Sequence, residues 1–87
     1  MERKVYLLYA HYEHKEGYDY EVEVFSNKEK ALERMKAVAD NYMNEFEVTK
    51  DSEDCEVEEQ EDAISIYPKG YYGDYSAELW IKEHEVL

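Results

Sequence analysis

A long amphipathic helix set between alternating segments most constrains the fold of this 87-residue chain. From Asn27 to about Phe46, apolar side chains recur every three or four residues, the period of one helix face. This stripe consists of Leu32, Met35, Ala39, Tyr42, Met43 and Phe46, widened by Ala31 and Val38. Ser26 and Glu29 form the pattern of a capping box, which predicts that the helix begins there.

The segments before the helix predict an antiparallel hairpin. Residues 3–12 carry apolar groups at both parities, which indicates a strand buried partly on both faces. A turn at Gly17 follows, and residues 18–24 then alternate. Their apolar face is Tyr18, Tyr20, Val22 and Val24, and their acidic face is Asp19, Glu21 and Glu23.

The segments after the helix predict a second hairpin. Residues 63–68 and 76–86 alternate like strands, and a glycine-bearing turn separates them. Their inward residues are predicted to be Ile64, Ile66, Ala77, Leu79 and Ile81. A short, charged edge strand over residues 55–59 is also expected.

Together these elements predict a single α+β domain over residues 1–87. The expected order is ββαββ, a four- or five-stranded antiparallel sheet with one long amphipathic helix packed on one face. One helix leaves the other sheet face open. We therefore expect the alternating carboxylates to project from that open face; the order of the strands stays open.

The charge of the chain is strongly negative, at −13, and uneven. Residues 1–50 carry a net charge of −3, whereas residues 51–87 carry −10. Such a surface disfavours nucleic acid and anionic membranes and favours basic partners. The ten bases and 23 acids thus predict no direct nucleic-acid binding and no membrane binding.

Residues that would support metal or catalytic chemistry are sparse, so we expect no enzyme and no cofactor. His11 and His14 have no third ligand nearby, and Glu56 stands where a calcium-binding EF-hand loop needs glycine. Acidic neighbours are expected to raise the pKa of the lone Cys55. A single cysteine and a short apolar stretch after the N-terminus favour a cytoplasmic protein.

The acidic run and the aromatic residues are the candidate partner-binding surface. The run is either a solvated, edge-protecting segment or a charge pattern that a partner recognises. The candidate contacts are Asp19, Glu21, Glu23, Glu56, Glu58, Glu59, Glu61, Asp62, Tyr71, Tyr72 and Trp80.

The first half of the chain resembles small uncharacterised proteins of Firmicutes bacteria, their phages and mobile elements. The matching residues are Val24, Phe25, Ser26, Lys28, Glu29, Lys30 and Ala31. In size and charge, the chain also resembles phage-encoded inhibitors of bacterial defence, including anti-CRISPR proteins, many of which mimic DNA.

Two functions follow as hypotheses. The first is an acidic protein that mimics nucleic acid and blocks the basic groove of a nucleic-acid-binding protein. The second resemblance implies a phage-encoded inhibitor of a CRISPR effector nuclease, located in the cytoplasm of a bacterial host cell. The alternative is a host regulatory or scaffold module, which could be a homodimer and whose acidity serves solubility. The sequence leaves the partner and the oligomeric state open.

Overall fold

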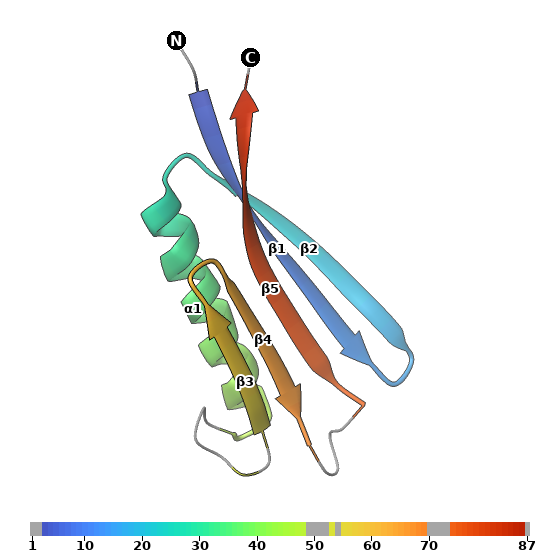
Figure 1. The fold of residues 1–87 in the computed structure, drawn as a ribbon. Helices are drawn as coiled ribbons and strands as arrows, with labels where there is room; N and C mark the ends of the chain where they lie inside the picture. Colours follow the sequence, from blue (N-terminus) through green and yellow to red (C-terminus); the bar gives the residue numbers. More distant parts are fainter. Residues whose placement is uncertain (1–2, 49–52, 54, 70–73, 87) are drawn as a thin grey trace.

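The computed structural model describes residues 3–48, 53, 55–69 and 74–86. It contains one five-stranded sheet and one helix, in the order ββαβββ (Figure 1). The elements are β1 (Arg3–His14), β2 (Gly17–Phe25), α1 (Lys28–Glu45), β3 (Cys55–Gln60), β4 (Ala63–Pro68) and β5 (Ser76–Val86). The predicted α+β class, with an antiparallel sheet and one long helix, is confirmed.

The strands lie in the order β2-β1-β5-β4-β3, and every neighbouring pair is antiparallel. Both predicted hairpins, β1–β2 and β4–β5, are present. The pairing that local patterns left open is β1 with β5, from Arg3 opposite Val86 to Glu13 opposite Ser76. This pairing places the two ends of the chain side by side (Figure 1).

The core lies between α1 and one face of the sheet. Met35 of the helix and Ile66 and Leu79 of the sheet are the largest fully buried side chains. Each removes its apolar surface from water, and truncating such a side chain to alanine typically costs about 2–5 kcal/mol. No charged or polar residue is buried among the described residues. The carboxylates of the described residues are therefore not part of the core.

The helix begins one residue later than the capping-box pattern predicts. The cap is Asn27, whose Oδ1 accepts from the amides of Glu29 at 2.7 Å and Lys30 at 3.3 Å. Asn27 has extended backbone angles, φ −134° and ψ 128°, as an N-cap requires. The assignment of the cap to Ser26 was therefore wrong, because the adjacent asparagine is also a strong capping residue.

The helix ends with a left-handed residue that is not glycine. Glu47 has φ 55°, and its amide donates to the carbonyl of Asn44 at 3.1 Å. The amide of Val48 donates to the carbonyl of Met43 at 3.0 Å. These two bonds form a Schellman motif, in which glycine is the usual residue at the position of Glu47.

The expected orientation of the β2 carboxylates was wrong. Glu21 pairs with Ala10, and Glu23 pairs with Leu8. Directly opposed residues share a sheet face, and Ala10 and Leu8 are buried in the core below α1. Asp19, Glu21 and Glu23 therefore lie on the helix side. This is tolerated because β2 is an edge strand, where the helix leaves room for polar side chains.

Candidate protein-binding surface

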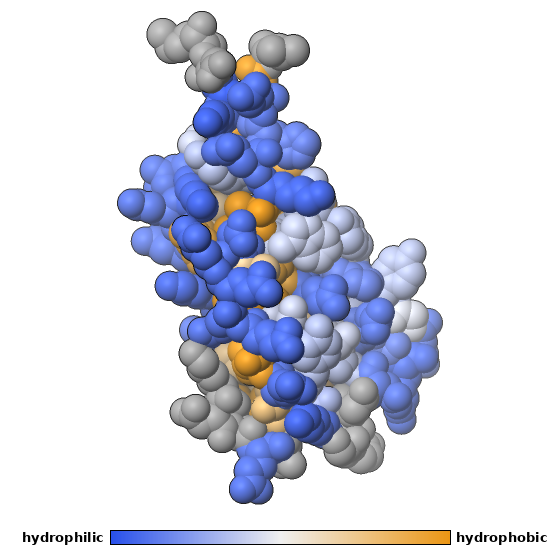
Figure 2. All heavy atoms as spheres, viewed as in Figure 1, coloured by the Kyte–Doolittle hydropathy of each residue, from blue (hydrophilic) through white to orange (hydrophobic). Residues whose placement is uncertain are grey.

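The open face of the sheet carries a cluster of five rings, which we call the aromatic cluster. Its members are Tyr9, His11, Tyr18, Tyr20 and Trp80. They come from β1, β2 and β5, which are adjacent in the sheet. In Figure 2, residues of intermediate hydropathy, drawn in pale blue and white, gather on the viewed face, with hydrophilic residues in blue around them and some hydrophobic residues in orange beside them.

The rings contact each other across strand boundaries. Tyr9 stacks on Trp80 with centroids 5.3 Å apart, and His11 meets the ring of Tyr18 edge-on at 5.3 Å. The ring centroid of Tyr20 lies 6.1 Å from that of Tyr9 and 6.2 Å from that of Trp80. Tyr18 and Tyr20 remain 69% and 51% exposed. Large, exposed rings fixed by their neighbours are typical of protein–protein contact sites.

The edge of the sheet formed by β3, opposite the edge formed by β2, is acidic. Five predicted contact residues lie along β3 and its turn to β4, and we call them the acidic edge: Glu56, Glu58, Glu59, Glu61 and Asp62. Glu56 and Glu58 belong to the open face, and Glu59 belongs to the helix side, because strand residues alternate. Lys69 Nζ lies 3.9 Å from the Glu56 carboxylate.

The acidic edge and the aromatic cluster are connected across the open face. Glu78 of β5 pairs with His11 on one side and with Ser65 of β4 on the other, and Ser65 in turn pairs with Glu58. The hydroxyl of Tyr67 donates to Glu78 at 3.4 Å. Aromatic and acidic groups therefore form one continuous surface.

The residues of the helix itself carry no net charge. Residues 28–45 contain four bases and four acids, so the helix is neutral and the rest of the chain carries the full charge of −13. The open face also carries Lys82 and His84 beyond Trp80, toward the chain ends. The acidic part of this face is thus the part nearest β3.

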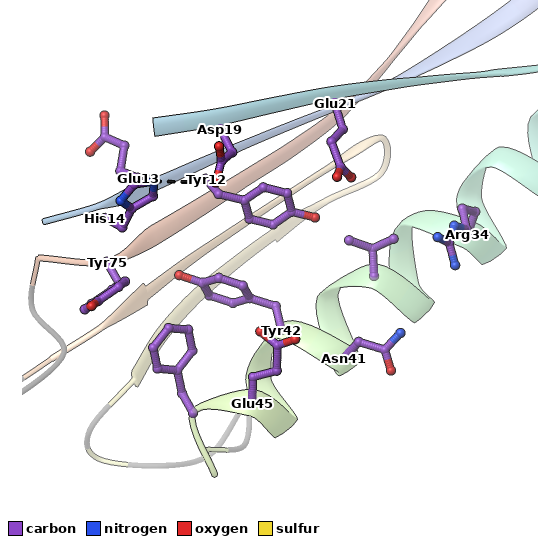
Figure 3. A pocket seen from close by; sticks show the side chains of 12 residues that line it. Tyr12, Glu13, His14, Asp19, Glu21, Arg34, Asn41, Tyr42, Glu45 and Tyr75 are labelled. Atoms are coloured by element: carbon purple, nitrogen blue, oxygen red, sulfur yellow. Dashed lines mark ion pairs between the residues drawn. The ribbon is translucent and has the colours of Figure 1, made fainter. Parts of the chain in front are cut away.

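The three acidic residues of β2 form a separate site on the other side of the sheet. Asp19 lies 3.4 Å from His14 Nε2, and Glu23 lies 3.1 Å from Arg34 Nε on α1. Asp19 and Glu21 line a groove of about 490 Å³ between α1 and the β1–β2 hairpin (Figure 3). These residues cannot join the acidic edge in one flat array, since β2 and β3 are opposite edges of the sheet.

The predicted contact residues thus divide into three groups. The residues of the acidic edge lie next to one another on β3 and its turn to β4. Trp80 lies on the open face, and the β2 carboxylates face the helix. Tyr71 and Tyr72 lie outside the described residues. The sequence interpretation missed four rings of the aromatic cluster: Tyr9, His11, Tyr18 and Tyr20. For Tyr9 and His11, the apolar groups at both parities of residues 3–12 indicated an occupied second face.

Cys55 is buried, and burial raises the pKa of its thiol. The predicted direction is correct, but the predicted cause was wrong: desolvation has the largest effect, and Lys69 opposes it. His11 and His14 point to opposite faces of β1 because their positions differ in parity. Within the part of the chain that the structure describes, no three His, Cys, Asp or Glu residues cluster to hold a metal ion.

Comparisons with known proteins leave the site to be interpreted from its own geometry. The sequence matches no protein-family model and no curated protein, and the fold matches no solved structure. Among the described residues, no helix has both the length and the apolar character needed to cross a membrane.

Proposed function

We propose that this chain is an acidic interaction protein that binds a basic surface of another protein. The observation that carries the proposal is the continuity of the acidic edge with the aromatic cluster across one rigid sheet face. Carboxylates would attract and orient a basic partner, and the rings would supply contact area at low entropic cost. The role is binding rather than catalysis.

A nucleic-acid-binding protein is the partner that this charge pattern suits best. Glu56 and Glu58 are two residues apart on one strand, so their side chains are spaced by about 6.7 Å, near twice the phosphate spacing along a nucleic-acid strand. A narrow edge strand with acids on both faces could enter a basic groove. A phage-encoded inhibitor of a CRISPR effector nuclease is the narrowest form of the proposal, and it rests on the likeness in size and charge.

The test is affinity capture from a bacterial lysate with the full chain immobilised. We expect the partner to be released by salt, by added DNA or by added RNA, because it would exchange one polyanion for another. The variant Glu56→Gln/Glu58→Gln should lose the partner, and Trp80→Ala should weaken it.

The matched control removes two charges from the neutral helix. Glu33 and Asp40 are exposed on α1, so Glu33→Gln/Asp40→Asn changes net charge equally but leaves the acidic edge intact. Capture should survive in this control. Equal capture at high salt and in excess nucleic acid, or equal loss in both double variants, would contradict the proposal.

A second candidate, a homodimeric scaffold, is favoured by the exposed apolar side of β2. On this side of β2, Val22 is 47% exposed and Val24 is 63% exposed. Because β2 is an edge strand, it could pair with β2 of a second copy. This function predicts that the mass in light scattering rises with concentration and that Val24→Lys abolishes the rise. A monomer at all concentrations would reject it.

A further inference from the structure

We propose that the groove between α1 and the β1–β2 hairpin binds an organic cation that carries an ammonium or guanidinium group. The groove lies on the helix side, at the edge of the sheet remote from the acidic edge. The inference therefore goes beyond the proposed protein-binding surface and is independent of it. The volume of the groove, about 490 Å³, is in the range of small-molecule sites.

Carboxylates on both walls favour a positive ligand. Glu21 extends from β2, and Glu45 extends from the last turn of α1 (Figure 3). Neither carboxylate forms an ion pair among the described residues, whereas Asp19 is paired with His14. A ligand cation placed between the walls would meet two carboxylates whose charge is not yet balanced.

The one arginine in the groove does not oppose a positive ligand. Arg34 lies at the far end in Figure 3, and its Nε is held 3.1 Å from Glu23. Its charge is thus largely compensated before a ligand arrives. Around Tyr12 the carboxylates prevail: after burial, Glu21 is the largest influence that raises the pKa of Tyr12, and it outweighs Arg34, which lowers that pKa.

Aromatic rings line the space between the carboxylates. Tyr12 from β1 and Tyr42 from α1 are stacked across the groove with centroids 5.7 Å apart. Phe46 and Tyr75 continue the wall. The centroid of the Phe46 ring lies 4.9 Å from that of Tyr42 and 5.4 Å from that of Tyr75. Ring faces attract ammonium and guanidinium groups, more strongly where water is excluded. Carboxylates and rings together select an organic cation over a hydrated metal ion.

An unpartnered hydroxyl provides an independent indication of a ligand site. Tyr42 is 8% exposed, and its Oη is buried with no hydrogen-bond partner. The hydroxyl points toward the end of the groove beside Tyr75 (Figure 3). Buried polar groups normally have partners, because an unmade hydrogen bond is costly. An N–H donor from a bound cation at this end would satisfy the hydroxyl.

The test is a titration of the full chain with spermidine and, separately, with N-acetyl-arginine methylamide, followed by calorimetry and by NMR. We expect saturable binding of at least one probe and shifts of the amides around Glu21 and Glu45. The variant Glu21→Gln/Glu45→Gln should weaken binding about tenfold, since both carboxylates face the cation. Tyr42→Phe should weaken it about fivefold by removing one hydrogen bond.

The control variant is Glu33→Gln/Asp40→Asn, which removes the same charge from exposed positions of α1 that do not line the groove. It should leave probe affinity within about twofold, because water and about 0.15 M salt screen exposed charges that do not contact the ligand. Binding of the arginine probe alone indicates a side chain of a peptide as the natural ligand, and binding of spermidine alone indicates a free polyamine. Absence of saturable binding, or equal weakening in the two double variants, would overturn the proposal.

Discussion

The ring of Tyr9 lies parallel to that of Trp80, with an interplanar angle of 9° and centroids 5.3 Å apart. The two residues are direct partners on β1 and β5, so the stack joins the two long strands at the middle of the sheet. Trp80 is the single tryptophan of the chain. Its fluorescence therefore reports on the open face, where the proposed partner binds.

The first prediction concerns the stability that this stack supplies. Tyr9→Thr should lower the free energy of unfolding by about 1–3 kcal/mol, because it removes both buried ring area and the aromatic pair. Threonine keeps the strand propensity, so the loss measures the ring. Urea unfolding followed by circular dichroism provides the measurement.

Tyr18→Thr is the matched control for this stack. Tyr18 is 69% exposed on β2, so the same substitution should cost less than about 0.5 kcal/mol. Equal losses at positions 9 and 18 would show that the stack adds no stability of its own.

Periodicity made most of the fold predictable, because each element depends on its own residues. The alternation of residues 63–68 and 76–86 predicted the strands that the structure contains, with Ile66 and Leu79 inward. The stripe from Leu32 to Phe46 likewise predicted the helix. The β1–β5 pairing was not predictable, since it joins residues as distant as Arg3 and Val86, whose contact no local pattern encodes.

The candidate site was predictable in composition but not in orientation. Alternation shows that Glu21 and Glu23 share a face, but not which face the helix covers. We expected the apolar side of β2 to face the core, whereas Tyr20 and Val22 lie on the open side. The physical reason is that an edge strand contributes little to the core, so its apolar side is free to extend the aromatic cluster.

The second prediction distinguishes the two capping residues of the helix. Asn27→Ala should lower the free energy of unfolding by about 1 kcal/mol, because the amides of Glu29 and Lys30 would lose their acceptor. Ser26→Ala should change it by less than about 0.5 kcal/mol. Urea midpoints measured side by side decide between them, and a larger loss for Ser26→Ala would reverse the assignment.

The third prediction concerns the left-handed residue after the helix. Glu47→Gly should stabilise the protein by about 0.5–1 kcal/mol, because glycine adopts a positive φ without the steric cost of a Cβ atom. Glu45→Gly is the control two residues earlier, inside the helix, where glycine should cost about 1 kcal/mol. Shifts of the same sign in both variants would be inconsistent with the Schellman geometry.

The fourth prediction is a loss of stability at alkaline pH that depends on Tyr42. Burial raises the pKa of the Tyr42 hydroxyl well above its ordinary value of about 10. Above pH ~10 the unfolded chain loses this proton while the folded chain retains it, so the unfolded state gains stability. The free energy of unfolding should then fall by up to about 1.4 kcal/mol per pH unit for this group. Below pH ~9 both states are protonated, and Tyr42 adds no pH dependence.

Tyr42→Phe should reduce the alkaline slope and, at neutral pH, stabilise the protein by about 1 kcal/mol, because it removes a buried hydroxyl without a partner. Tyr18→Phe, at an exposed position, should change neither quantity. Urea unfolding at several pH values from about 7 to 11 measures both effects. Tyr12 should leave a residual slope of the same sign in the Tyr42→Phe variant, because burial raises the pKa of Tyr12 as well. An unchanged slope after Tyr42→Phe would mean that the hydroxyl is solvated in the folded protein, which would also remove the main support for a ligand donor in the groove.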